Sequence, residues 1–253
     1  MKVDGKGALV TGGAQGLGKA FSKILLQNGA KVFFTDINEE VGKTTLTEFQ
    51  QTYGQNNVRF FKADVTSTAQ MKESFDMAKS WLGGLHVVVN NAGIGGEGDD
   101  MWEKLIDINL KGPIRCSRLA VDYMRRDKGG EGGVIINISS AGGLRPNPYG
   151  PVYCASKAGL IMYSRSIAAN QEYTSNGVRV CTLCPSFADT ALVANITKGT
   201  TTNTEAALAL VNQVGIMTVE EVADCLHELV TDDSKNGAVL AVSKKQGKTY
   251  VPF

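Results

Sequence analysis

Histidine, proline and unbalanced charge are scarce in this 253-residue sequence, which contains two histidines and six prolines. His86 falls at the start of a predicted strand and His227 within a predicted helix, which argues against a histidine-based catalytic triad or a zinc site. We therefore expect no bound metal. The 26 lysines and arginines nearly balance the 25 aspartates and glutamates, so the composition carries no basic footprint for nucleic acid.

Long apolar segments are also absent from the sequence. The longest apolar stretches, such as residues 206–211, are far shorter than the roughly 18 residues that a membrane-spanning helix requires. Residues 1–5 are not followed by the apolar core and small-residue cleavage site of a secretory signal. We expect no membrane span and a cytoplasmic protein. The odd number of cysteines, five, indicates small buried side chains rather than a disulfide framework.

The sequence does contain a regular alternation of two kinds of segment. Short apolar runs are separated by longer segments in which apolar residues recur with helical spacing. Near-continuous apolar strands alternating with helices are typical of a parallel sheet covered on both faces. We predict an α/β fold, a single doubly wound Rossmann domain with a seven-stranded parallel sheet and helices on both faces. The predicted strands cover residues 7–11, 32–35, 58–62, 86–90, 134–139, 178–183 and 238–242, and the main helices 18–27, 39–50, 69–81, 151–173 and 219–230.

No linker, repeat or low-complexity tract divides the chain, so we expect residues 1–253 to form one domain. Two stretches interrupt the alternation, residues 94–101 and residues 186–218. Both follow predicted strands, and ligands of open α/β sheets bind outside the carboxyl ends of the strands. We therefore predict that these stretches form the walls of a substrate site, with residues 186–218 as a helical lid.

A glycine-rich segment, residues 11–18 (TGGAQGLG), lies between the first predicted strand and the first predicted helix. Because glycine has no Cβ, main-chain N–H groups at such a helix start can approach a pyrophosphate, and the helix dipole favours its charge. Such turns are also common without a ligand. Asp36 strengthens the hypothesis, since it ends the second strand 18 residues after Gly18, where a carboxylate can bind the hydroxyls of an adenosine ribose. A solvated turn residue is the alternative for Asp36.

A carboxylate at Asp36 would repel a 2′-phosphate, so the predicted cofactor is NAD rather than NADP. Asp64 and Val65, at the end of the third strand, would border the adenine, although an aspartate there can also simply cap a helix. The residues that this pattern assigns to the coenzyme are Gly12, Gln15, Gly16, Leu17, Gly18, Asp36, Asp64 and Val65.

Tyr153 and Lys157 are four residues apart in a predicted helix, so their side chains share one face. An unperturbed tyrosine has a pKa of roughly 10, and a neighbouring ammonium group can stabilise the phenolate that a base near neutral pH requires. The spacing is also a frequent coincidence on amphipathic helices. Residues 137–140 (NISS) end the fifth strand and bring a hydroxyl to the carboxyl edge of the sheet, where residues 90–93 (NNAG) end the fourth.

Together these motifs resemble those of the short-chain dehydrogenase/reductase family. The TGxxxGxG pattern at residues 11–18 and the NNAG at residues 90–93 are typical of it. The chain also carries, in the family's order, the set Asn109, Ser140, Tyr153 and Lys157. The joint match spans nearly the whole chain.

The resemblance implies a role for each member of this set. Tyr153 would be the general acid/base, and Ser140 would hydrogen-bond the substrate oxygen. Lys157 would bind the nicotinamide ribose and lower the pKa of Tyr153, while Asn109 would hold a water of a proton relay. The resemblance also implies coenzyme contacts from Asn91, Tyr153, Lys157 and Thr190.

Within the family, the framework is most similar to that of enzymes that oxidise 15-hydroxyprostaglandins with NAD. The similarity rests on residues 5–6, 129–133, 151–157 and 236–238. It implies hydride transfer to NAD from a lipid-like secondary alcohol, a 15-hydroxyprostaglandin or similar hydroxy fatty acid, giving the ketone. A dehydrogenase for a steroid, retinoid or terpenoid alcohol and a catalytically silent NAD-binding regulatory protein are the alternatives.

Four residues are predicted to contact the substrate, namely Ser140, Gly150, Tyr153 and Phe187. Gly150 stands where those enzymes carry a substrate-contacting glutamine, and Ser186 follows Pro185 where glycine is usual. The expected partner is a small-molecule alcohol or ketone, with no nucleic acid. The resemblance further implies a homodimer or homotetramer, paired through the helices around residues 113–126 and 151–173.

Overall fold

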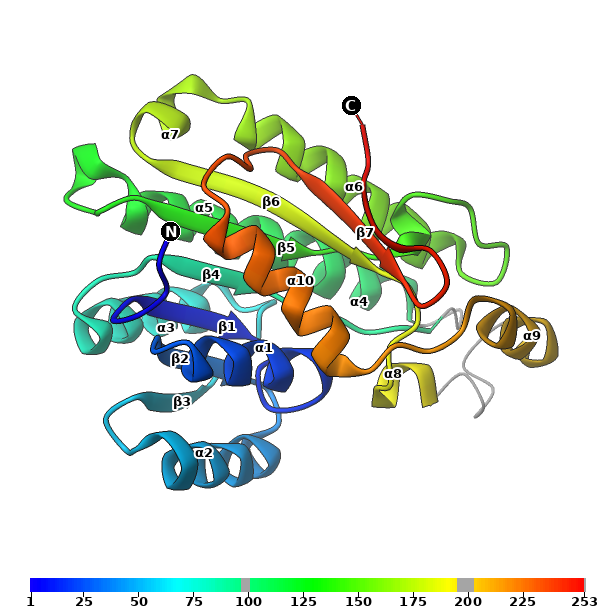
Figure 1. Ribbon diagram of the computed structural model, residues 1–253, viewed down its shortest axis with the longest axis horizontal. Coiled ribbons are helices and arrows are strands. Elements are labelled where there is room, and N and C mark those ends of the chain that lie inside the picture. Colours follow the sequence, from blue (N-terminus) through cyan, green and yellow to red (C-terminus); the bar gives the residue numbers. More distant parts are fainter. Residues whose placement is uncertain (97–100, 195–202, 253) are drawn as a thin grey trace.

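The computed structural model describes residues 1–96, 101–194 and 203–252, and within them an eight-stranded sheet lies between two layers of helices (Figure 1). The strands are β1 (Gly7–Thr11), β2 (Lys31–Asp36), β3 (Val58–Lys62), β4 (Val87–Asn90), β5 (Gly133–Ile138), β6 (Val178–Pro185), β7 (Val239–Ser243) and β8 (Gly247–Tyr250). Their order across the sheet is β3-β2-β1-β4-β5-β6-β7-β8. The first seven are parallel, and β8 pairs antiparallel with β7 at the edge.

The helices divide between the two faces of the sheet (Figure 1). The elements that pack on one face are α1 (Gly16–Gln27), α2 (Glu39–Tyr53) and α10 (Val219–Thr231). Those on the other face are α3 (Thr68–Leu82), α5 (Gly112–Met124) and α6 (Pro151–Ala168). The remaining helical segments are α4 (Trp102–Ile106), a π turn at Asp107–Lys111, 3-10 turns at Arg126–Lys128 and Ala141–Gly143, α7 (Gln171–Ser175), α8 (Ala191–Ala194) and α9 (Thr204–Val214).

Continuous apolar strands are explained by burial on both faces. In β1, Ala8 and Val10 pack with α1 and α10, whereas Leu9 between them packs with α3 and α5 on the opposite side. Successive side chains of a strand point to opposite faces, so every position of a doubly covered strand must be apolar. This architecture confirms the predicted doubly wound α/β fold with helices on both faces of seven parallel strands.

Two elements differ from the sequence prediction. The helix expected over residues 151–173 ends at Ala168, because the Asn170 side chain accepts the Glu172 N–H at 2.9 Å and starts α7. Strand β8 was not predicted, since its side chains are all exposed and carry no apolar alternation. Among the described helices, none has both the length and the apolar character needed to cross a membrane.

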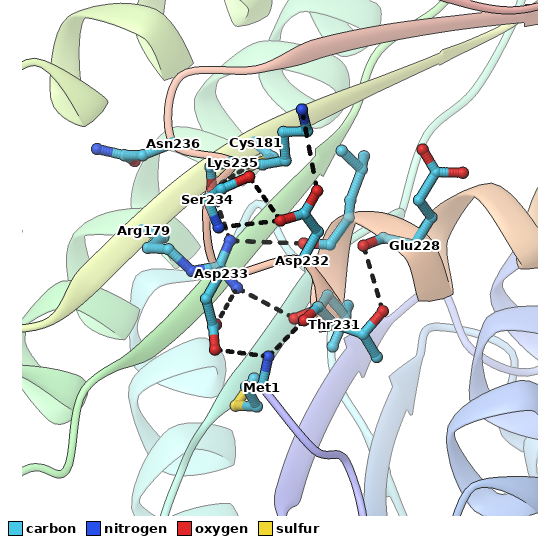
Figure 2. Close-up of polar contacts among 12 residues, drawn as sticks. Met1, Arg179, Cys181, Glu228, Thr231, Asp232, Asp233, Ser234, Lys235 and Asn236 are labelled. Carbon is cyan, nitrogen blue, oxygen red and sulfur yellow. Dashed lines mark hydrogen bonds and ion pairs between the residues drawn. The ribbon is translucent and has the colours of Figure 1, made fainter.

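A polar cluster fixes the amino-terminal edge of the sheet (Figure 2), whereas the glycine-rich segment follows the carboxyl end of β1. Arg179, near the start of β6, donates to the Lys235 carbonyl at 2.6 Å and pairs with Asp233 at 3.1 Å. The Met1 ammonium pairs with Asp233 at 2.8 Å and donates to the Thr231 carbonyl at 2.6 Å. The cluster thereby anchors the connection from α10 to β7.

The carboxyl edge of the sheet contains the point where the strand order reverses. β1 and β4 are neighbours, yet β1 continues into α1 on one face and β4 leads toward α4 and α5 on the other. The connections therefore diverge and leave a crevice between them, which is where open α/β sheets bind ligands.

Candidate active site

A cavity of about 330 Å³ lies at this crevice. Residues from the ends of β1, β2, β4, β5 and β6 line it. The wall includes every residue that the sequence assigns to coenzyme binding, namely Gly12, Gln15, Gly16, Leu17, Gly18, Asp36, Asp64, Val65, Asn91, Tyr153, Lys157 and Thr190. Ser140 is also on the wall, whereas Asn109, Gly150 and Phe187 are not.

The glycine-rich segment is shaped for close approach. Gly12 has a φ of +63°, and a Cβ there would lie 2.8 Å from the Ala92 Cα, while a Cβ at Gly18 would lie 1.9 Å from the Gly12 carbonyl oxygen. Helix α1 begins here with no side-chain cap on Gln15 and no acidic residue in its first turn. Its first N–H groups and its dipole therefore face the cavity without a competing side chain, which fits a pyrophosphate.

Neighbouring strands hold this segment in place. The Asn91 side chain, just after β4, donates to the main-chain oxygens of Thr11 at 3.1 Å and Gly12 at 2.9 Å. The Thr11 hydroxyl accepts from the N–H groups of Asn91 at 3.1 Å and Ala92 at 3.2 Å. Asn91 therefore braces the glycine-rich turn as well as lining the cavity.

Asp36 ends β2 with its side chain 8% exposed at the cavity wall. Its two carboxylate oxygens accept the N–H groups of Ala14 at 3.1 Å and Asn38 at 3.0 Å. Among the described lining residues the basic side chain is that of Lys157, which contacts the end of β5, two strands beyond β1. Asp36 thus suits a ribose diol, and among the described lining residues no cation lies beside it for a phosphate, since the Lys62 ammonium on the neighbouring strand pairs with Glu39.

Tyr153 and Lys157 occupy successive turns of α6, and Ser140 follows β5 opposite them. The Lys157 ammonium donates to the Ile138 carbonyl at 3.0 Å and lies 5.7 Å from the centre of the Tyr153 ring. Ser140 hydrogen-bonds the Tyr153 hydroxyl. Ser139 donates to the Lys157 carbonyl at 2.8 Å and so ties α6 to the end of β5.

Burial is the main influence on the pKa values of Tyr153 and Lys157. Desolvation raises the pKa of Tyr153, and the hydrogen bond from Ser140 lowers it by less. The net direction is opposite to the lowering by Lys157 that the resemblance implies, because the burial of the phenol outweighs the other influences. Burial lowers the pKa of Lys157 itself to about 8, partly offset by Cys184.

This lowered pKa makes Lys157 a source of pH-dependent stability. Below about pH 8 the buried Lys157 carries its proton in the folded protein, and this buried charge destabilises the fold. Between about pH 8 and pH 10.5 Lys157 keeps the proton only in the unfolded chain. The free energy of unfolding therefore rises with pH in this range. We expect Lys157→Met to raise the free energy of unfolding near neutral pH by on the order of 2 kcal/mol. Loss of the hydrogen bond to the Ile138 carbonyl reduces this gain. The gain should disappear toward pH 10.5.

Urea unfolding of wild type and variant across this pH range measures the effect. Lys23→Met, at an exposed lysine on α1, is the matched control for the loss of a lysine. A stability difference for Lys157→Met that does not change with pH would contradict the prediction.

Asn109 lies in the π turn and is completely buried. Its side-chain nitrogen donates to the Ile94 carbonyl and its oxygen accepts the Ile94 N–H, both at 2.8 Å. The amide therefore positions the segment after β4, whose Ile94 lines the cavity, and a π turn at such a place is typical of functional sites. The side chain itself does not reach the cavity wall.

The predicted lid is only partly visible, because residues 195–202 lie outside the described part of the chain, as do residues 97–100 of the other wall. The two ends of the lid are joined by a β-bridge between Ala188 and Met217, flanked by a 2.9 Å bond from the Met217 N–H to the Phe187 carbonyl. The main chain of Phe187 is thus held by this hydrogen bond at the base of the lid. Gly150 is buried at the start of α6, and neither Gly150 nor Phe187 lies on the described wall of the cavity. Their contact with a substrate stays a prediction.

Apolar wall residues that the sequence did not single out include Ile37 after β2, Ile138 at the end of β5 and Ile108 in the π turn. The first two lie at or directly after a strand end, and that position was the signal that could have identified them. Ile94, Ala188 and Val193 also line the cavity, and they belong to the two stretches that were predicted to form the walls of the site.

Comparison with known proteins identifies the family. A model of the short chain dehydrogenase family matches residues 6–201. The 15-hydroxyprostaglandin dehydrogenase (NAD(+)) of Rattus norvegicus is 38% identical over 252 residues, 98% of this chain and 94% of that protein. The 3-oxoacyl-(acyl-carrier-protein) reductase FabG of Thermotoga maritima is 31% identical, covering 96% and 98% of the two chains. The crystal structure of gox2181 superposes with a TM-score of 0.82 at 28% identity and 94% coverage of each chain. The chain is therefore a dehydrogenase of the short-chain dehydrogenase family.

Proposed function

We propose that this enzyme oxidises a lipid-like secondary alcohol to the ketone with NAD. One observation carries the proposal: Ser140, Tyr153 and Lys157 share a single cavity with Asp36, so that a proton-transfer group and a ribose-binding carboxylate face one elongated ligand. The relatives named 15-hydroxyprostaglandin dehydrogenase (NAD(+)), at 38% identity, support both the coenzyme and the substrate class.

In the proposed mechanism, NAD supplies the acceptor for the hydride that leaves the carbinol carbon. Ser140 would hydrogen-bond the alcohol oxygen and hold it beside Tyr153, whose phenolate form would accept the alcohol proton. The Lys157 ammonium orients the nicotinamide ribose, and its positive charge favours the phenolate. The Asn109 side chain uses both of its polar atoms to bind the main chain of Ile94. A water of the proton relay would therefore be held by the main chain of Asn109.

The walls around the reacting groups support an apolar substrate. Ile94 and Val193 line the cavity, and the described lining residues near Tyr153 include one charged group, Lys157. Burial of apolar substrate surface against such walls supplies binding energy of about 25 cal/mol per Å². A hydroxylated fatty-acid derivative is the substrate class that best combines this wall with the named relatives.

The test is the appearance of reduced nicotinamide absorbance when the purified protein meets NAD and a 15-hydroxyprostaglandin. A hydroxysteroid, a retinol and a terpenoid alcohol complete the panel. We expect turnover of the prostaglandin with the highest kcat/KM. Turnover of another alcohol alone would overturn the substrate class, and tight NADH binding without any turnover would overturn the catalytic assignment.

Three further predictions accompany this proposal. We propose one domain over residues 1–253, with 186–218 as the substrate lid. We propose a homodimer or homotetramer through α5 and α6, supported by Met162 on α6, which is 57% exposed. Gel filtration with light scattering measures that state. A cytoplasmic location stays a prediction from the sequence.

A further inference from the structure

Arg115 joins α5 to the turn that follows β3. Its Nη1 donates to the Val65 carbonyl at 2.6 Å and its Nε to the Thr68 hydroxyl at 2.8 Å. One rigid guanidinium therefore bridges two points on the same turn.

Stabilisation of α3 does not explain this arrangement. Thr68 is the first residue of α3, where the helix dipole disfavours a cation, and Ser67 already caps the helix. Among the described residues no carboxylate forms an ion pair with Arg115. The guanidinium instead serves to hold the main chain at Val65 in place.

The fixed turn forms the far wall of the cavity. Asp64 and Val65 line it beyond Asp36, because β3 is the next strand outward from β2. Helix α5 also contacts Val65 directly, since a Cβ on Gly112 would lie 3.1 Å from the Val65 Cγ2. The position of this wall is thus set jointly by the first turn of α5 and by the Arg115 side chain.

We propose that Arg115 is a positioning residue for the adenine half of the bound dinucleotide. This inference rests on the proposed function, in which Asp36 binds the adenosine ribose and Tyr153 and Lys157 lie at the nicotinamide end. With the ribose at β2, the adenine lies toward β3, against the turn that Arg115 holds. Arg115 touches no ligand and acts through Val65.

Separate binding of the two halves of the coenzyme tests the inference. Calorimetry with AMP as the adenine probe and nicotinamide mononucleotide as the other probe compares wild type with Arg115→Met. We expect the variant to bind AMP and NAD about tenfold more weakly, since a charge-assisted bond to the turn is lost, and to bind the mononucleotide unchanged. Arg115→Lys, which keeps one donor but not the fork, should be intermediate.

Arg118→Met is the matched control, because Arg118 is exposed on the same helix, and it should match wild type with all three ligands. Unchanged AMP affinity in Arg115→Met, or an equal loss for the mononucleotide, would overturn the inference. If that variant does not fold, an AMP affinity of Arg115→Lys equal to wild type overturns it instead. Failure of wild type to bind AMP or NAD would overturn the proposed coenzyme site itself.

Discussion

Replacing Tyr153 with phenylalanine is expected to lower kcat by about 10²- to 10⁴-fold, the usual contribution of a positioned acid/base group. The substitution removes one hydroxyl, which hydrogen-bonds Ser140 at the cavity wall, and keeps the aromatic ring. Because the glycine-rich turn and Asp36 are untouched, the affinity for NAD should change less than about twofold. Stopped-flow or steady-state absorbance measures kcat, and fluorescence quenching measures NADH binding.

Tyr163→Phe is the matched control for this experiment. Tyr163 lies on the same helix, donates a long bond of 3.4 Å to the Ile114 carbonyl and also hydrogen-bonds the Ser117 side chain. Loss of its hydroxyl should leave kcat within about twofold, as expected for hydrogen bonds away from the cavity. Equal loss of turnover and of NADH affinity in Tyr153→Phe would show that this residue supports the fold of the site rather than proton transfer.

Asp36→Ala is expected to narrow the preference for NAD over NADP by about 1000-fold in kcat/KM. The buried carboxylate and a 2′-phosphate would be like charges within a few ångströms, and such a pair costs about 4 kcal/mol at an effective dielectric constant of 20. Some NAD affinity should be lost as well, since Asp36 accepts the Ala14 N–H at 3.1 Å. Steady-state kinetics with both coenzymes gives the ratio.

A second variant, Thr45→Val, separates the effect of the Asp36 charge from the effect of a loosened glycine-rich loop. The Thr45 hydroxyl donates to the carbonyl of the same Ala14 at 2.7 Å, so Thr45→Val loosens the loop without removing a charge. It should weaken NAD and NADP alike and keep their ratio. An unchanged ratio in Asp36→Ala would remove the carboxylate from coenzyme selection.

The fold could be predicted because burial on both faces of the sheet requires apolar residues along the whole of each strand. Runs such as Val87 to Val89 are apolar at every position because both sheet faces are covered, and helical spacing marked the intervening segments. Strand β8 could not be predicted in the same way. Its pairing with β7 depends on a turn and on contacts to α10, such as the 2.7 Å bond from Tyr250 to Glu228, that no apolar pattern signals.

The site was predictable where a motif brings residues together locally. Gly12 and Asp36 follow consecutive parallel strands, whose ends meet at one edge, and Tyr153 and Lys157 are neighbours by helix geometry. What depends on long-range packing was not predictable from the sequence. The net direction of the Tyr153 pKa follows from burial, and the bond from Arg115 to Val65 crosses 50 residues of sequence.

The braced glycine-rich turn has a consequence for how a ligand would arrive. Asn91 holds the main chain at Thr11 and Gly12, and Thr45 holds it at Ala14, so the turn already has a fixed shape. A preorganised loop loses little conformational entropy on association, and that saving appears directly as affinity. Docking at this end of the cavity is therefore a rigid-body event, with any rearrangement on binding confined to other parts of the wall.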